Sequence, residues 1–261
     1  QDSIIVAASS PYPNYTKNVL LSYYARSIYS YKGKYIVNAS LRRDGSSRFS
    51  PEQRWGLFPA VSAAWLLTEE DFLKNSKAIN MLKLRAGWGV TGQQDGIGDY
   101  AYIGNYFLGA TTAQYAFGGQ YYQVLRPAGF DANLKWETTA SYNLGLDFGF
   151  KNDRFSGSID VYRKETSDLL ATVPVPAGTN FTNMILTNVG GMRNQGIEVS
   201  MNTGIIAKKN MRLDWSINAT YNENTVTKLS LVSDPKSPGV LVGGIGGGIG
   251  NTIQVHQVGY A

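Results

Sequence analysis

The sequence predicts an all-β protein: an antiparallel, up-and-down transmembrane β-barrel segment of about eight strands. Three observations lead to this fold class. The chain holds 29 Gly, 17 Tyr, 10 Phe and 5 Trp but only 16% charged residues, a balance typical of β structure. Apolar and polar residues alternate over segments of strand length. Tight turns and long loops join these segments, as in barrels that cross a membrane with strands.

The first half of the chain predicts four strands. Val19 to Tyr31 and Tyr35 to Arg43 are expected to form a hairpin around a tight turn at Lys32 to Lys34. Trp55 to Leu67 and Met81 to Thr91 supply two more strands, which alternate less cleanly. The connection between them, Thr68 to Asn80, is expected to hold one short helical turn.

The second half shows the clearest alternation. From Trp136 to Phe150 the even-numbered residues make a nearly continuous apolar side, and the odd-numbered residues are polar or glycine. Because successive side chains of a strand point to opposite faces, this segment predicts a strand with one apolar face. The pattern continues from Phe155 to Tyr162 after a tight turn at Lys151 to Asp153. It recurs from Ile197 to Ile205 and from Leu213 to Tyr221, around a turn at Lys208 to Asn210.

Strand length and the order of connections favour a membrane barrel. The strands run to roughly 11–16 residues, whereas soluble strands average about 5–6. A 15-residue strand tilted by about 40° climbs roughly 38 Å, enough to cross an apolar band of about 25 Å. Long connections are expected at Gly92 to Lys135 and Leu170 to Asn194. Aromatic residues near strand ends predict interfacial girdles: Tyr29, Tyr31, Tyr35, Trp136, Phe148, Phe150, Phe155 and Tyr162.

Several functions are excluded or poorly supported by composition. The net charge of +5 is scattered and forms no dense basic block, so nucleic-acid binding is not expected. The chain has no Cys and one histidine, His256, which reads as a loop residue, so neither an enzyme nor a metal or cofactor site is expected. Asp95 and Asp99 lack calcium-loop spacing. The glycines from Gly243 to Gly250 fit no phosphate-loop pattern and read as a flexible external loop.

The segment from Gly92 to Lys135 is aromatic and almost uncharged. Such an external loop either packs into the mouth of the barrel or meets a partner or a sugar-like ligand. The sequence alone is compatible with both interpretations. The candidate contacts to a ligand or a partner are Tyr100, Tyr102, Tyr106, Phe107, Tyr121 and Tyr122.

Five sequence segments, which follow one another along most of the chain, resemble the SusC/RagA family of TonB-dependent outer-membrane transporters of Bacteroidetes. They are SLRRDGSSRFSPEQRWGLFPAVSAAW with EEDF following (from Ser40), LKLRAGWGVTGQQDGIGDYAY (from Leu82), NLKWETTASYNLGLDFGFKNDRFSGSIDVYRKETSDLL (from Asn133), NVGGMRNQGIEVSMNT (from Asn188) and WSINATYNENTVTKL (from Trp215).

The resemblance implies a 22-stranded barrel closed by a separate plug domain. Such a barrel imports oligosaccharides or peptides under a surface lipoprotein lid of the SusD/RagB kind, with energy supplied through TonB. No stretch of the chain matches the plug or the TonB-binding segment, so residues 1–261 are expected to be one partial barrel domain, embedded in outer-membrane lipid and lipopolysaccharide. The tight turns are expected to face the periplasm.

Two alternatives stay open. A complete eight-stranded outer-membrane barrel, serving as an adhesin or structural anchor, is the first, because eight strands can close. Against it, the chain begins in loop and ends without a closing strand. A secreted β-sandwich that binds sugars is the second, and it would need shorter strands.

Overall fold

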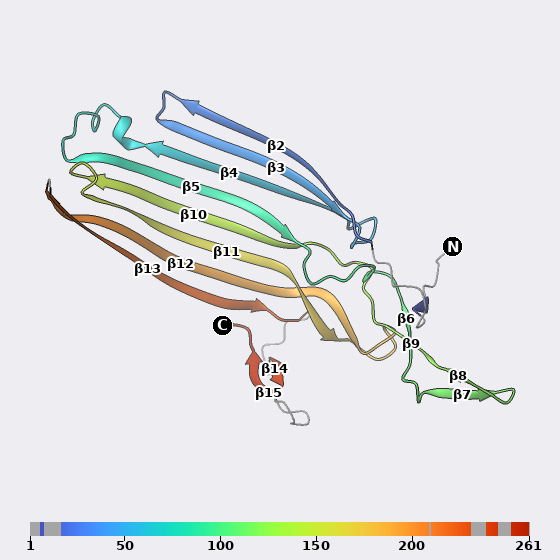
Figure 1. Cartoon of the computed structure of the whole chain (residues 1–261). Helices are drawn as coiled ribbons and strands as arrows, with labels where there is room; N and C mark the ends of the chain where they lie inside the picture. Colours follow the sequence, from blue (N-terminus) through green and yellow to red (C-terminus); the bar gives the residue numbers. More distant parts are fainter. Residues whose placement is uncertain (1–5, 8–16, 209, 231–238, 245–251, 261) are drawn as a thin grey trace.

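The computed structural model describes residues 6–7, 17–208, 210–230, 239–244 and 252–260. Its centre is one antiparallel sheet of eight long strands that follow one another in chain order (Figure 1). This sheet confirms the predicted fold class. The strands are β2 (Leu20–Tyr31), β3 (Tyr35–Ser46), β4 (Trp55–Leu66), β5 (Ile79–Gln93), β10 (Glu137–Phe150), β11 (Phe155–Pro174), β12 (Met184–Lys208) and β13 (Met211–Lys228).

The eight-stranded sheet is open. Its edge strands are β2 and β13, and they do not pair with each other. A closed eight-stranded barrel, the first alternative above, therefore does not match the structure. Among the described residues no helix is long and apolar enough to cross a membrane.

The tight turns after β2 and β10 lie at the same end of the sheet as the β4–β5 connection, and we call this end the turn end (Figure 1). The turn after β2 uses left-handed backbone at Lys32 and Gly33, and the turn after β10 uses it at three successive residues, Lys151 to Asp153. Left-handed backbone is uncommon for residues other than Gly and Asn, so its presence at Lys32 and Lys151 reflects the constraint of a tight turn. The connection between β4 and β5 holds the expected helical turn, the 3₁₀ helix η1 (Leu67–Glu69).

An aromatic stack and one carboxylate organise the turn end of β2 to β4. The rings of Tyr31 and Tyr35 lie 6.4 Å apart, and those of Tyr35 and Trp65 lie 6.1 Å apart. Glu70 accepts hydrogen bonds from Tyr35 Oη at 2.6 Å, Trp65 Nε1 at 3.0 Å and Lys34 Nζ at 3.1 Å. These bonds, in that order of importance, lower the pKa of the Glu70 carboxyl from 4.5 to about 2. Glu70 thus ties the β4–β5 connection to the β2–β3 turn.

The opposite end, the loop end, carries the short strands. Gly92 to Lys135 supplies a hairpin and two strands of a small sheet, which the strand at Val6–Ala7 completes, and these extend away from the main sheet (Figure 1). His256, expected in a loop, is the exposed last residue of a strand. Of the glycine-rich segment, residues 245–250 lie outside the described residues. The short strands are β1 (Val6–Ala7), β6 (Tyr106–Leu108), β7 (Gln114–Phe117), β8 (Gln120–Gln123), β9 (Leu125–Pro127), β14 (Val240–Gly244) and β15 (Thr252–His256).

Strands β11 and β12 are longer than the sequence predicts. The expected long connection Leu170 to Asn194 is wrong, because only the residues between Pro174 and Met184 separate the two strands. The pairing shifts register between Ser167 and Leu170, where Asp168 has φ +60°. Such bulges exchange the two faces of a strand, so the apolar alternation is lost although the strand continues.

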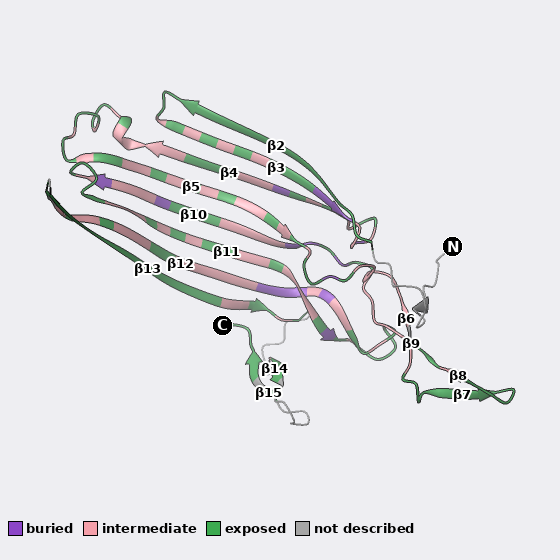
Figure 2. Ribbon diagram, viewed as in Figure 1, coloured by how far each residue is buried: buried purple, intermediate pink, exposed green. Residues whose placement is uncertain are grey.

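Buried side chains gather at the loop end rather than along the sheet (Figure 2). The core cluster consists of Phe49, Phe58, Ile97, Leu134 and Trp136. The Trp136 ring lies 5.0 Å from Phe49 and 5.4 Å from Phe58, and its Nε1 donates to the Arg54 carbonyl oxygen. Trp136 was predicted to be a girdle residue and belongs instead to this core.

Candidate functional site

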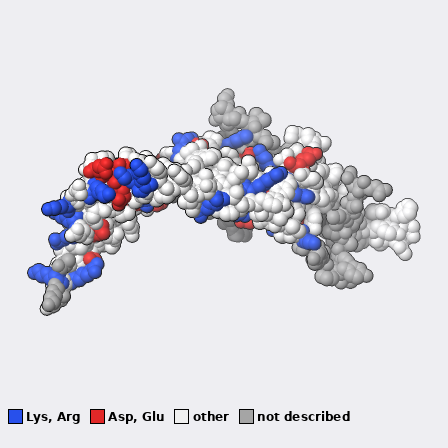
Figure 3. All heavy atoms as spheres, turned by 90° about the horizontal axis from the view of Figure 1, so that it is seen from above, with Lys and Arg blue, Asp and Glu red and all other residues white. Residues whose placement is uncertain are grey.

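The register of the sheet separates its long strands into a polar and an apolar face. Asp147 of β10 stands opposite Lys83 of β5, and the adjacent Leu146 stands opposite Leu84. Because successive side chains point to opposite faces, the charged groups of β5 and β10 share one face and their leucines the other. Tyr162, predicted as a girdle residue, is on the polar face, since it lies against Gly196 beside the polar residues of β12. Seen from above, the molecule is arched and many Lys and Arg side chains gather at the turn end (Figure 3).

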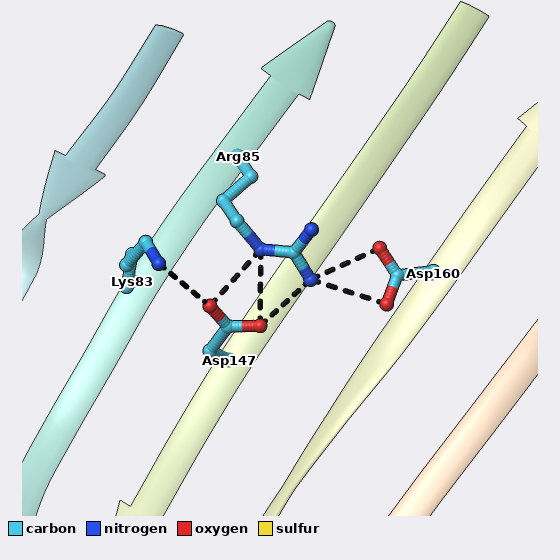
Figure 4. Close-up of polar contacts among 4 residues, drawn as sticks. All are labelled: Lys83, Arg85, Asp147 and Asp160. Carbon is cyan, nitrogen blue, oxygen red and sulfur yellow. Dashed lines mark hydrogen bonds and ion pairs between the residues drawn. The ribbon is translucent and has the colours of Figure 1, made fainter. Parts of the chain in front are cut away.

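Four charged residues form a bridge across three strands of the polar face (Figure 4). Arg85 Nη2 lies 2.7 Å from Asp147 Oδ1 on β10 and 3.0 Å from Asp160 Oδ1 on β11. Lys83 Nζ lies 3.1 Å from Asp147 Oδ2. Two positive and two negative charges balance, so the group joins the three strands and carries no net charge itself.

Gly145 makes the bridge geometrically feasible. It stands opposite Arg85 and Asp160, the two residues that the bridge must join across β10. A Cβ at this position would meet Arg85 Nη2 at 2.7 Å and would also overlap the Asp160 carboxylate. The missing side chain therefore lets the guanidinium lie flat over β10.

A hollow of about 420 Å³ adjoins the bridge on β3, β4, β5 and β10. Small residues, Ser62, Ala64 and Gly87, leave this space open beside Arg85. Farther along the face, Asn194 Nδ2 donates to Asn222 Oδ1 at 2.7 Å, and Ser216 Oγ donates to Asn202 Oδ1 at the same distance. The polar face thus combines balanced ion pairs with amides and hydroxyls, which is the chemistry of a water-filled barrel interior.

No group of three or more His, Cys, Asp or Glu residues in the described part of the chain could hold a metal ion. Asp99 forms an ion pair of 3.0 Å with Arg48, which joins the β3–β4 loop to the long loop.

The structure divides the six predicted contact residues into two groups. Tyr100, Tyr102 and Tyr106 are half-buried in the loop, where the Tyr106 ring lies 5.7 Å from Phe181 of the β11–β12 loop. Tyr121 and Tyr122 are exposed and belong to β8. Phe107 lies in β6, and its side chain is outside the described part of the structure.

Strands β7 and β8 form a hairpin whose aromatic residues are exposed. Gly118 and Gly119 make its turn with positive φ, and the rings of Tyr115 and Tyr122 stack at 5.6 Å. Phe117 is 71% exposed and Tyr121 75% exposed. Sequence reasoning did not select Tyr115 and Phe117 as contacts, although a Gly-Gly pair between two short β-prone runs is a hairpin signal.

Side-chain amides fix the last part of the long loop to the wall. Asn188 of β12 accepts a bond from the Lys135 backbone N–H and donates one to the Lys135 carbonyl, both at 2.9 Å. Its Nδ2 also donates to the Asp168 carbonyl at 2.7 Å. Asn180 makes a similar reciprocal pair with the Phe130 backbone. The base of the loop is therefore held in place, and the β7–β8 hairpin extends from it.

The long strands, the two faces and the alternation of turns and loops define a segment of outer-membrane β-barrel wall. Comparison with known proteins gives its family. A match to the family described as TonB dependent receptor-like, beta-barrel, covers residues 2–250. The chain belongs to this family, whose members are transporters of the bacterial outer membrane and not enzymes.

Relatives and solved structures agree with this assignment. The chain is 44% identical to TonB-dependent receptor SusC of Bacteroides thetaiotaomicron over 94% of its length and 24% of SusC. It is 41% identical to TonB-dependent receptor P39 of Formosa agariphila over 82% of its length and 20% of that protein. The RagAB peptide importer in its open-open state aligns with a TM-score of 0.73 at 27% identity, over 84% of this chain and 24% of the importer chain. The chain thus spans about a quarter of the relatives it matches.

Proposed function

We propose that this chain is part of the barrel wall of a TonB-dependent importer that takes up oligosaccharides or peptides with a SusD/RagB-like surface lipoprotein. The observation that carries the proposal is the 44% identity to SusC over nearly the whole chain, together with the fold shared with the RagAB peptide importer. TonB would act through parts of the intact protein that do not match this chain.

The two ends of the sheet suit different sides of the membrane. Outer-membrane barrels have short periplasmic turns and long external loops, so the turn end faces the periplasm and the loop end faces the exterior. On β11 the apolar face ends at Val161, and Arg163 to Pro174 continue beyond it. At about 3.3 Å per residue and a tilt near 40°, this portion adds roughly 30 Å of wall outside the membrane. The lipoprotein lid would rest on this external wall.

The β7–β8 hairpin is our candidate contact to the lid or the substrate. Its exposed aromatic side chains offer large apolar surfaces with polar hydroxyl groups, the residue types enriched where proteins bind partners. Tyr100, Tyr102 and Tyr106 are half-buried in the long loop, so we expect them to act by packing.

The hairpin can be removed cleanly, because Val124 N donates to Ala113 O at 2.9 Å and the chain ends left by the deletion are adjacent. In the intact transporter, a variant in which Gly-Gly replaces residues 114–123 is expected to lose most of its uptake and its co-purifying lipoprotein. Uptake is measured with radiolabelled oligosaccharide and peptide mixtures, and the lipoprotein by quantitative immunoblot. Full uptake together with full lipoprotein retention would exclude the hairpin as a contact.

A matched control keeps the hairpin and changes only its polar residues. Replacing Gln114 and Gln120 with Ser leaves the four aromatic rings in place and is expected to leave uptake unchanged. A second variant replaces the four aromatic residues with Ser: Tyr115, Phe117, Tyr121 and Tyr122. It is expected to lose uptake and co-purifying lipoprotein to the same extent as the deletion.

A further inference from the structure

Three side chains on the apolar face meet where β2, β3 and β4 reach the loop end. Tyr23 of β2 and Trp55 of β4 have ring centroids 6.0 Å apart with an interplanar angle of 22°. The guanidinium of Arg43, on β3, lies 4.9 Å from the centroid of the Trp55 ring. All three residues are exposed, so together they form an accessible aromatic and cationic surface.

Gly45 fixes this arrangement. It stands opposite Trp55 in the register of β3 and β4. A Cβ at Gly45 would meet carbon atoms of the Trp55 ring at 2.8 Å, so the ring lies flat against the β3 backbone. The ring thus packs on the strand at Gly45, with the Arg43 guanidinium over it and the Tyr23 ring nearly parallel to it.

The charge of Arg43 is not neutralised by any described carboxylate. Arg42, the preceding residue on the opposite face, pairs with Asp44 at 2.7 Å. Arg163, at the corresponding edge of the apolar face on β11, pairs with Glu165. Within the described ranges Arg43 forms no such ion pair, which leaves its guanidinium free to bind an anion.

The depth of Arg43 indicates what kind of anion it meets. Leu41 and Leu57, the next residues toward the turn end on the same face, are 47% and 57% exposed, as expected of side chains in the lipid-facing band of a barrel. Aromatic belts and arginines at such a boundary lie at the level of lipid headgroups. Because the loop end faces the exterior, this is the outer leaflet, where the abundant lipid is lipopolysaccharide.

We propose that Tyr23, Arg43 and Trp55 bind the phosphorylated glucosamine headgroup of lipopolysaccharide. The guanidinium donates two hydrogen bonds to a phosphate, as planar arginine forks do. The rings of Tyr23 and Trp55 offer flat surfaces to the sugar, and the acyl chains lie on Leu41 and Leu57. The site is independent of which nutrient the transporter imports.

The test compares lipid A with the same lipid A after its phosphates have been removed by phosphatase. Both lipids, in detergent micelles, are titrated against the intact transporter, and bound lipid is counted by native mass spectrometry. Loss of a charge-assisted phosphate contact is expected to make R43Q bind phosphorylated lipid A roughly tenfold more weakly. Binding of the dephosphorylated lipid is expected to be the same in wild type and R43Q.

R26Q is the matched control, because Arg26 is an exposed arginine on β2 that points to the polar face, where it donates to Asn38. It removes the same charge and is expected to leave binding of both lipids unchanged. If R43Q does not assemble, R43K keeps the charge and loses the planar fork, and an intermediate affinity is expected. Equal binding of the two lipids by the wild type, or equal losses in R43Q and R26Q, would overturn the proposal.

Discussion

At the scale of single residues, a glycine decides whether the ion-pair bridge of the polar face can form. Gly145 lies under the guanidinium of Arg85, and a side chain there would push it away from Asp147 and Asp160. Breaking this network leaves half-buried charges with fewer partners. We therefore regard Gly145 as a structural requirement of the wall and not as a flexible point.

Gly145→Ala in the intact transporter is expected to lower the free energy of unfolding by roughly 1–3 kcal/mol, the cost of losing charged hydrogen bonds in a partly buried network. The control is Gly87→Ala, a glycine on the same face whose added Cβ would meet only the Ser62 Cβ at 3.8 Å. Urea unfolding followed by tryptophan fluorescence measures both variants. An equal loss in G145A and G87A would contradict the role of the bridge.

Glu70 predicts a pH dependence of stability. Its folded-state pKa of about 2 is lower than the ordinary value of 4.5, so the unfolded chain binds a proton more readily than the folded one. The stabilisation from Glu70 is therefore fully present above about pH 4.5 and is lost as the pH falls toward 2. The midpoint temperature of thermal unfolding should therefore decrease as the pH is lowered from about 4.5 toward 2 in the wild type. The decrease should be smaller in Glu70→Gln.

Glu69→Gln is the control for this experiment, because Glu69 is exposed and forms no ion pair within the described ranges. Its pH profile is expected to follow the wild type. Identical pH profiles for wild type and E70Q would show that the hydrogen bonds of Glu70 do not contribute to the pH dependence of stability.

At the scale of elements, β12 holds the long external loop through one amide. Asn188 makes three hydrogen bonds to the backbone of Lys135 and Asp168. Asn188→Ala is expected to raise the rate of hydrogen exchange for residues 128–136, since each unmade bond costs about 1–3 kcal/mol locally. Exchange in β10 and β13 should stay the same. A variant at Asn222, an amide of the polar face outside this contact, serves as the comparison, and equal exchange in the two variants would refute the assignment.

The elements also show how far the sequence predicts the structure. Lys209, in the third predicted turn, lies outside the described residues. Alternation of apolar and polar residues, clear in the second half of the chain and weaker in β4 and β5, located all eight long strands and the tight turns after β2 and β10. It failed on the outer halves of β11 and β12, where the bulges near Asp168 and Gly191 exchange the faces. It also misplaced Trp136, since spacing alone cannot show that Phe49 and Phe58 cover this residue. The exposure of the aromatic side chains of β7 and β8 could not be predicted either, because it depends on tertiary packing.

At the scale of the whole molecule, the two open edges matter most. Among the described residues, strands β2 and β13 each have one edge without a partner strand, although the Val226 backbone of β13 bonds to Gly259 and Tyr260. Unpaired edges recruit other strands, and in lipid each unsatisfied group is costly. The wall therefore depends on neighbouring strands for its stability.

The chain refolded by itself in detergent is expected to self-associate through these edges. Size-exclusion chromatography with light scattering should show oligomers that grow with protein concentration. A monomer whose migration on a gel shifts on heating, the behaviour of a closed barrel, would contradict the open sheet and restore the small-barrel alternative.

The core of Phe49, Phe58 and Trp136 also affects the thermodynamics of binding. Ordering a free loop costs about 1–2 kcal/mol per residue, and a partner that binds such a loop must supply this free energy. Here the core and the Asn188 contacts order the base of the loop during folding, before any partner arrives. The entropy lost on association is then confined to the hairpin, which favours rapid binding and release over tight retention.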